Sequence, residues 1–215
     1  MNGQRNLSSN IDFHSHILPA IDDGAENTEK SLKLIDAALK SGIEKIYATP
    51  HYYAHKLDVD TFCERRQKAY EKLMNKNPTI PIELGAEVLV FAGLENMGGI
   101  EKLCFYDDKT LLLELPLSES LITDEHFLTV EALSQKFNIV MAHANRYSDY
   151  TVMQMLEAGA SLQLNVVDAC AFSQRRRVKY WRDSGFVFAL GSDAHRDAGV
   201  YKKFKRAGKL LSADR

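Results

Sequence analysis

The chain has 215 residues, which is enough for one well-packed domain and too few for two comfortable ones. Hydrophobic residues make up 45% of it and charged residues 26%, as in an ordinary globular protein, and a formal net charge of -2 gives no general electrostatic reason to bind nucleic acid or an anionic membrane. Cys63, Cys104 and Cys170 are too few and too far apart for a disulfide framework or a CxxC metal site.

The N-terminal segment carries no targeting signal that the sequence reveals. Residues 1–10 are polar and lack the apolar stretch of a signal peptide, so we expect a flexible lead-in at 1–10 and one folded domain at 11–215. No apolar run approaches the ~20 residues that are needed to span a bilayer. These features predict a cytoplasmic protein without membrane insertion and without a nucleic-acid partner.

Short apolar runs alternate with amphipathic stretches along the whole chain. In chain order, the pattern predicts a strand at 11–13, a helix at 28–41, a strand at 44–48, a helix at 59–74, strands at 80–85 and 111–115, a helix at 124–136, a strand at 139–142, a helix at 150–158, a strand at 161–165, a helix at 175–183, a strand at 186–190 and a helix at 200–211. This alternation is typical of a parallel sheet, and seven strands fit an α/β barrel slightly smaller than the eight-fold form. An open doubly wound sheet is the competing topology, although no glycine-rich nucleotide-binding loop accompanies it.

Histidines and carboxylates gather where the predicted strands end, which is the end of a parallel barrel that carries active sites. Residues two apart in an extended chain point to the same side, so two histidines in an HxH motif can bind one ion. A carboxylate inside an apolar run is costly to bury unless it is paired or bound to metal. The strand-end residues, in chain order, are His14, His16, His51, Glu87, Glu114, His143, Asp193 and His195.

Each of these residues also has an ordinary structural interpretation; a single histidine such as His143 is more often a hydrogen-bonded structural residue. The joint pattern nevertheless favours a metal site, with more candidate ligands than one ion needs. Imidazole and carboxylate ligands suit Zn, Mn or Fe, and two or three such ions ~3.5–4 Å apart would activate water for phosphoester hydrolysis. Asp22 and Asp23 either form a turn with Gly24 or add ligands. We expect His126 on a helix surface and His55 in a loop near the mouth of the site.

The motifs HSH, TPH, GAE, LELP, AHxxRY and SDAH occur in this order and resemble the PHP (polymerase and histidinol phosphatase) superfamily. Within it, HSHILPAIDDGA and ATPH are most similar to the bacterial capsular-polysaccharide tyrosine phosphatases of the CpsB and YwqE type. The resemblance runs from about Ile11 to His195. It implies a distorted (β/α)7 barrel of PHP type in a single domain, with a trinuclear site that is often manganese-dependent.

The resemblance also implies roles for individual residues. Arg146 would clamp the substrate phosphate, the alternative being an ordinary surface arginine, and Asp193 or His195 would assist the leaving group. A water or hydroxide bridging the ions would attack phosphorus. The implied ligands are His14, His16, Glu87 and Asp193 for the first ion, Glu87, Glu114 and His143 for the second, and Asp23, His51 and His195 for the third.

The function that the resemblance implies is removal of phosphate from tyrosines on the tail of a kinase that controls capsular or exopolysaccharide synthesis. The alternatives are a small-molecule phosphatase of the histidinol-phosphate kind, a phosphodiesterase, and a non-catalytic metal-binding scaffold. The chain departs from the family pattern by reading AHANRY where AHPERY is typical, and Arg196, Lys202 and Lys203 offer no secure match for a later basic residue. The run at 175–177 is either a basic rim of the site or a solvated helix face.

Overall fold

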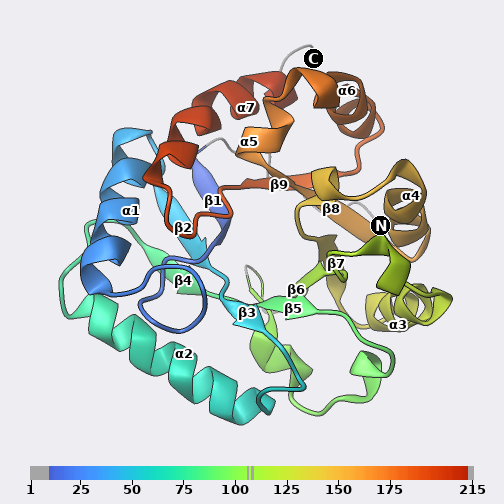
Figure 1. Ribbon diagram of the computed structural model, residues 1–215, viewed down its shortest axis with the longest axis horizontal. Helices are drawn as coiled ribbons and strands as arrows, with labels where there is room; N and C mark the ends of the chain where they lie inside the picture. The colour runs from blue at the N-terminus through green and yellow to red at the C-terminus, as the bar shows by residue number, and fades with distance from the viewer. Residues whose placement is uncertain (1–9, 106, 108, 213–215) are drawn as a thin grey trace.

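A computed structural model describes residues 10–105, 107 and 109–212, so the lead-in predicted for residues 1–10 lies outside the described residues apart from Asn10. Parallel strands form a ring at the centre, and helices cover its outside (Figure 1). The strands are β1 (Ile11–Ser15), β2 (Lys45–Ala48), β3 (His51–Tyr52), β4 (Ile82–Leu84), β5 (Glu87–Leu89), β6 (Thr110–Glu114), β7 (Asn138–Met141), β8 (Ala160–Asn165) and β9 (Val187–Gly191).

The strands pair in two parallel sheets, with the orders β1-β2-β4 and β3-β5-β6-β7-β8-β9. Two strand units are each interrupted once, one between β2 and β3 and the other between β4 and β5. The first half of each unit lies in one sheet and the second half in the other, so these two units connect the sheets. Backbone hydrogen bonds continue across both interruptions: Gly85 donates to Ala48 at 2.9 Å, and Glu87 donates to Pro50 at 3.1 Å. Pro50 has no N–H to give to a ladder, which is one physical reason for a break at this point.

The ring closes between β1 and β9 through a few backbone bonds rather than a long ladder. Asp193 donates its N–H to the carbonyl of His14 at 2.8 Å, and His16 donates to the carbonyl of Ala194 at 3.0 Å. The strand order therefore returns to its start after seven strand units, counting each interrupted pair as one. The predicted parallel α/β fold of (β/α)7 type is confirmed.

Some helices begin at a side chain that accepts a backbone N–H of the first turn, as Asn27 and Asp58 do. The helix predictions at 59–74 and 175–183 agree with the structure at both ends, whereas the stretch predicted at 200–211 begins as a 3-10 helix. No helix in the described ranges is long and apolar enough to cross a membrane. The helices are α1 (Thr28–Lys40), α2 (Val59–Met74), α3 (Asp124–Ser134), α4 (Asp149–Glu157), α5 (Val166–Ala169), α6 (Arg175–Asp183) and α7 (Phe204–Ser212).

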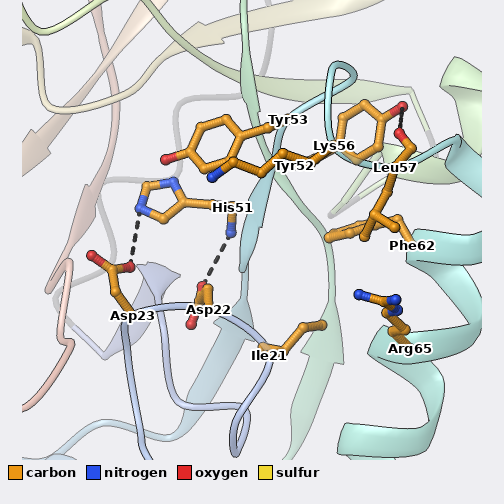
Figure 2. Close-up of a pocket in the computed structure, with 10 residues that line it drawn as sticks. All are labelled: Ile21, Asp22, Asp23, His51, Tyr52, Tyr53, Lys56, Leu57, Phe62 and Arg65. Carbon is orange, nitrogen blue, oxygen red and sulfur yellow. Dashed lines mark hydrogen bonds and ion pairs between the residues drawn. The ribbon is translucent and has the colours of Figure 1, made fainter.

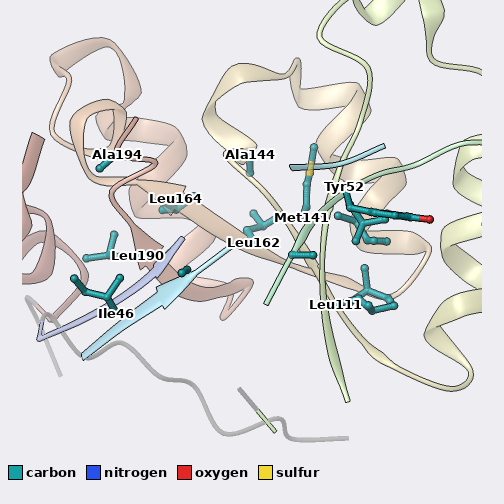
Figure 3. Packing of buried hydrophobic residues seen from close by; sticks show 14 of the residues in the cluster. Ile46, Tyr52, Leu111, Met141, Ala144, Leu162, Leu164, Leu190 and Ala194 are labelled. Carbon is teal, nitrogen blue, oxygen red and sulfur yellow. The ribbon is translucent and has the colours of Figure 1, made fainter. Parts of the chain in front are cut away.

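The core has two layers, as β6 illustrates. Leu111 and Leu113 belong to the large cluster between strands and helices, part of which Figure 3 shows. Leu112 belongs to a smaller cluster inside the ring, in which the rings of Phe13 and Tyr47 stack with their centroids 5.2 Å apart. Because both faces of β6 are covered, its sequence is a continuous apolar run. Glu114 shares a strand face with Leu112, and this places it above the inner cluster, at the carboxyl end of the ring.

Asp12 is a fully buried carboxylate in β1 that holds the closure of the ring. Ser192, which directly follows β9, donates its N–H to Asp12 at 2.8 Å and its hydroxyl at 2.6 Å. The backbone N–H of His14 is a third donor, at 3.3 Å. Burial raises the pKa of Asp12 to about 6, although the hydrogen bonds from Ser192 oppose that rise.

Asp12→Ala is expected to lower the free energy of unfolding by about 2–4 kcal/mol, because it leaves the buried donors of Ser192 without a partner. Urea denaturation in the presence of a chelator measures this loss apart from any effect of metal. Asp36→Ala on α1 removes only an exposed ion pair with Lys40 and should change stability by less than about 0.5 kcal/mol. Equal values for the two variants would contradict the closing role of Asp12.

Candidate metal centre

The predicted metal ligands other than Asp23, which lies in the loop after β1, are at the carboxyl ends of the strands or just beyond the strand interruptions. His14 is in β1 and His16 directly follows it; Glu114 ends β6; the histidine and aspartate of SDAH follow β9. His51 and Glu87 occupy the starts of β3 and β5, just beyond the two strand interruptions. The structure groups ligand atoms of these residues into three sets: His14, His16 and Glu87; His51, Glu87 and Glu114; and His16, Asp23, His51 and His195.

The first set is fully buried. Glu87 Oε2 lies 3.1 Å from Nε2 of His14 and 3.2 Å from Nε2 of His16, and these two nitrogens are 3.2 Å apart. Asp193 Oδ1 lies beside the same nitrogens, at 3.7 Å and 3.4 Å. Four potential ligand atoms from three parts of the chain thus face a common point.

The outer nitrogens of both histidines are held by hydrogen bonds. His16 Nδ1 lies 2.7 Å from a carboxylate oxygen of Asp22, which can only accept, so His16 carries its proton on that side. His14 Nδ1 lies 3.0 Å from Gln163 Oε1, and that oxygen also accepts the N–H of His143 at 2.7 Å. Both Nε2 atoms therefore offer a lone pair toward the centre, as in metal-bound histidines with a fixed tautomer.

Lone pairs that face one another repel unless a cation lies between them. Glu87 Oε2 is buried and makes no hydrogen bond among the described residues, although it lies within 3.2 Å of His14, His16 and His51. Burying a carboxylate oxygen in this way is costly without a proton or a metal ion. The donor set therefore fits divalent cations, which histidine nitrogens and carboxylate oxygens bind together.

Glu87 also belongs to the second set. Its Oε1 lies 2.7 Å from Nε2 of His143, and that nitrogen is 3.7 Å from Glu114 Oε2. His51 Nδ1 lies 3.0 Å from Glu87 and 3.2 Å from Glu114. The two oxygens of Glu87 thus face different groups of ligands, which is the geometry of a bridging carboxylate.

The third set is the most open of the three. Asp23 Oδ1 lies 3.3 Å from Nε2 of His195 and 3.6 Å from Nε2 of His51, and 69% of the Asp23 side chain is exposed. The ring of His195 stacks on that of His16 with the centroids 3.9 Å apart. His51 borders two sets, with Nδ1 toward Glu87 and Nε2 toward Asp23.

The electrostatics of the centre favour bound positive charge. Burial alone would lower the pKa of His16, but the neighbouring carboxylates of Asp193, Asp22 and Glu87 outweigh burial and hold this pKa well above its usual value. Burial alone would raise the pKa of Glu87, but His14 and its neighbours hold it well below its usual value. Protons and metal ions therefore compete for the same place, and metal binding should release protons.

Two of the predicted ligands have a backbone conformation that non-glycine residues rarely adopt. The φ angle is +35° at His143 and +53° at Asp193. Gln163 accepts the N–H of His143, and Asn165 donates to Asp193 Oδ2 at 2.9 Å, so the neighbouring strand β8 holds both residues in place. Strain of about 1–3 kcal/mol per residue persists only where surrounding structure supports it, and it is concentrated at functional sites.

Comparison with known proteins decides the family. The family model for capsular polysaccharide synthesis proteins, CpsB/CapC, matches residues 10–213. The chain belongs to the CpsB/CapC family. This confirms the resemblance that the HSH, GAE and SDAH motifs indicated.

Named relatives and solved structures agree with this assignment. Tyrosine-protein phosphatase YwqE of Bacillus subtilis is 26% identical over 196 residues, covering 86% of this chain and 77% of YwqE. Tyrosine-protein phosphatase CpsB of Streptococcus pneumoniae is 24% identical over 201 residues, covering 86% of this chain and 82% of CpsB. A crystal structure from work on YwqE and CpsB, described as metal-dependent tyrosine phosphatases, superposes with a TM-score of 0.76 at 24% identity and covers 95% of this chain and 87% of its own. The phosphotriesterase homology protein of Escherichia coli shares the fold, with a TM-score of 0.53 at 11% identity over 94% of this chain and 88% of its own.

Several residues that orient the ligands of this CpsB/CapC protein were not singled out from the sequence. Gln163 and Asn165 alternate with leucines in the predicted strand LQLN, so their shared face was a usable signal. Asp22 was assigned either to a turn or to a ligand role; it accepts the N–H of Gly24 at 3.0 Å, which forms the turn, and it orients His16. A Cβ on Gly24 would lie 2.2 Å from the His16 carbonyl oxygen, so only glycine fits there.

Asp22→Asn is expected to weaken metal binding by about 10- to 100-fold, because an amide is a weaker partner for His16 and lowers the basicity of its ring. Titration of the metal-free protein against a competing chelator measures this change. Asp36→Asn, on the exposed side of α1, is the matched control and should leave affinity unchanged. Unaltered affinity in Asp22→Asn would show that His16 does not depend on this partner.

The basic residues near the centre differ in how they are engaged. Arg146, in the 3-10 helix Ala144–Arg146, pairs with Asp193 through Nη2, and 42% of its side chain remains exposed. Arg177 does not form a free basic rim, because its Nε pairs with Asp149 at 2.7 Å and its Nη2 donates to the Tyr147 carbonyl at 2.7 Å. Arg196 lies 3.3 Å from Glu26.

The remaining two histidines lie outside the three sets. His126 caps the start of α3, where its Nδ1 accepts the N–H of Thr123 at 3.2 Å. His55 is exposed in the loop after β3, and its ring lies 5.8 Å from that of Tyr53. Neither contributes to a group of candidate ligands within the described residues.

Proposed function

We propose that this protein is a metal-dependent phosphatase that removes phosphate from phosphotyrosine in a protein substrate, on the tail of a kinase that controls capsular or exopolysaccharide synthesis. The observation that carries the proposal is the buried group of histidine nitrogens and carboxylate oxygens around Glu87, with the half-exposed Arg146 beside it. Family membership and the names of the relatives YwqE and CpsB support the reaction class.

The centre would hold two or three divalent ions, with manganese favoured and zinc or iron as alternatives. Bound ions would lower the pKa of water and neutralise charge on the phosphate during displacement. Glu87 would bridge two of the ions, since its two oxygens face different sets. The proposed ligands are His14, His16, Glu87 and Asp193 for one ion, Glu87, Glu114 and His143 for another, and Asp23, His51 and His195 for a third.

The side chains around the ions would bind and orient the phosphate. A guanidinium can contact two phosphate oxygens at once, and Arg146 has the exposure to reach a substrate from its place beside Asp193. Asp193 accepts hydrogen bonds from Arg146 and Asn165, so it would act as an ionised ligand rather than as a proton donor. His195, 27% exposed at the open side, is better placed to pass a proton to the leaving group. Phenolate, with a pKa near 10, needs little such help.

A small-molecule phosphatase is the second candidate, because of one specific feature. Asp23 is largely exposed and lines a cavity of about 560 Å³ beside the third set of ligands. In a centre that holds only two ions, the carboxylate of Asp23 would be available to recognise the amine of a substrate such as histidinol phosphate. The two functions therefore differ in what this cavity binds.

The test combines elemental analysis of the purified protein with phosphate release, after addition of manganese, from a phosphotyrosine peptide and from histidinol phosphate. We expect two or more ions per chain and a higher kcat/KM for the peptide. Preference for histidinol phosphate would replace the first function with the second. An inactive protein that stays free of metal after addition of manganese, zinc or iron would overturn both.

A further inference from the structure

A cavity of about 560 Å³ opens beside the candidate metal centre, between the loop after β1, the segment around β3 and helix α2 (Figure 2). This volume lies within the range of about 300–1,000 Å³ that is usual for sites that bind small groups. Asp22, Asp23 and His51 line the side toward the metal centre, and Lys56 and Arg65 line other parts of the wall. The cavity thus joins the reaction centre to two basic side chains.

The acidic side of the cavity is already engaged by the metal centre. Asp22 accepts hydrogen bonds from His16 at 2.7 Å and from the N–H of His51 at 3.1 Å. Asp23 lies within 3.6 Å of His51 and His195. These carboxylates face imidazoles, so little of their charge is left for a group that enters the cavity.

The basic side is different, because its charges have no acidic partner in the described part of the chain. Exposed lysines elsewhere, such as Lys33 and Lys102, pair with Glu29 and Asp60. No such ion pair is found there for Lys56 or Arg65.

Lys56 is nevertheless held in place. Its Nζ lies 4.2 Å from the centre of the Tyr53 ring. This ring stacks on the His51 ring, with the two ring centroids 5.2 Å apart. The Tyr53 ring thus contacts both the ammonium group and a candidate metal ligand. Arg65 projects from α2 at the side of the cavity away from Asp23, where Ile21 and Phe62 give the wall an apolar surface (Figure 2). Both Lys56 and Arg65 are exposed, so salt should screen their charges.

We propose that this cavity is a specificity subsite for an anionic side chain that neighbours the phosphorylated tyrosine in the substrate, with Lys56 and Arg65 as its binding partners. The proposal rests on the proposed function, because the phosphate must be bound at the metal centre for a neighbouring side chain to reach the cavity. Consecutive Cα atoms in a peptide are 3.80 Å apart, so a residue adjacent to a tyrosine whose phosphate is bound at the metal centre would stay near that centre, beside which the cavity opens. Complementary charge of this kind sets substrate preference and association rate more than total affinity.

The test compares three phosphotyrosine peptides that differ only in the residues on either side of the tyrosine: Gln, Glu or phosphoserine. Free phosphotyrosine serves as the basal substrate. For the unmodified protein we expect kcat/KM to be about tenfold higher for the Glu peptide than for the Gln peptide, as two partly exposed charge contacts allow. A further gain with phosphoserine would identify a second phosphate, rather than a carboxylate, as the better occupant. Raising the salt concentration should reduce either preference.

The double variant Lys56→Ala, Arg65→Ala should lose the preference for the Glu peptide and keep its activity on free phosphotyrosine. Lys68→Ala, which removes another exposed charge from α2, is the matched control and should keep the preference. Reversing both charges, with Lys56→Glu and Arg65→Glu, should make the Gln peptide the better substrate. Equal rates on the Glu and Gln peptides, with free phosphotyrosine hydrolysed, would overturn the subsite alone. No hydrolysis of any phosphotyrosine substrate would overturn the proposed function as well.

Discussion

Glu87→Gln is expected to remove metal binding and turnover together, and this is the largest effect that the structure predicts. One oxygen of Glu87 lies within 3.2 Å of His14, His16 and His51, and the other lies 2.7 Å from His143. An amide cannot present two anionic oxygens to two groups of ligands. Turnover should fall by more than about a thousandfold, since several kcal/mol of electrostatic stabilisation by the ions would be lost.

Thermal unfolding measures the metal binding of this variant separately from its activity. At a concentration 100 times its Kd, an ion that binds only the folded state adds about 2.7 kcal/mol, which for a chain of this size raises Tm by about 5–10 °C. Manganese should give such a rise in the unmodified protein and none in Glu87→Gln. Glu83→Gln, on the exposed side of β4, should behave like the unmodified protein. A normal rise in Tm for Glu87→Gln would show that the ions bind elsewhere.

Arg146→Ala is expected to reduce kcat/KM for a phosphotyrosine peptide by about 100- to 1,000-fold while metal content is preserved. A positive group placed on the transferring phosphate contributes an effect of this size or larger in related chemistry. The metal content should survive because Asp193 keeps its hydrogen bond from Asn165 at 2.9 Å and its backbone bond to His14 at 2.8 Å. Activity and elemental analysis of the same preparation provide the two measurements.

Two further variants sharpen the interpretation of Arg146. Arg146→Lys keeps the charge but not the two-point contact of a guanidinium, so it should restore only part of the activity. Arg176→Ala removes an exposed arginine from α6 and should have no effect on kcat/KM. Loss of metal in Arg146→Ala would instead assign this residue the structural role of holding Asp193.

The sequence was informative where local pattern decides structure. The bounds of the helices at 59–74 and 175–183 were predicted to the residue. The full extents of the paired strands predicted at 44–48 and 80–85 were harder to predict. Each strand continues beyond an interruption that the apolar pattern does not show. The first resumes at His51 and the second at Glu87. Short segments such as α5 and the 3-10 helix Ala144–Arg146 are too brief for any periodicity to reveal.

The sequence by itself predicted which residues would gather in one place, because in a parallel barrel every strand end lies on the same face and the ends are marked by the apolar runs before them. It did not determine how these residues are oriented. His14 meets Gln163 across 149 positions of the chain, and Ser192 meets Asp12 across 180, only because the ring of strands closes. Which nitrogen of a histidine carries the proton, which oxygen of Glu87 faces which group, and which arginine stays free all depend on such contacts. Tertiary packing sets these contacts, and no local pattern in the sequence reveals them.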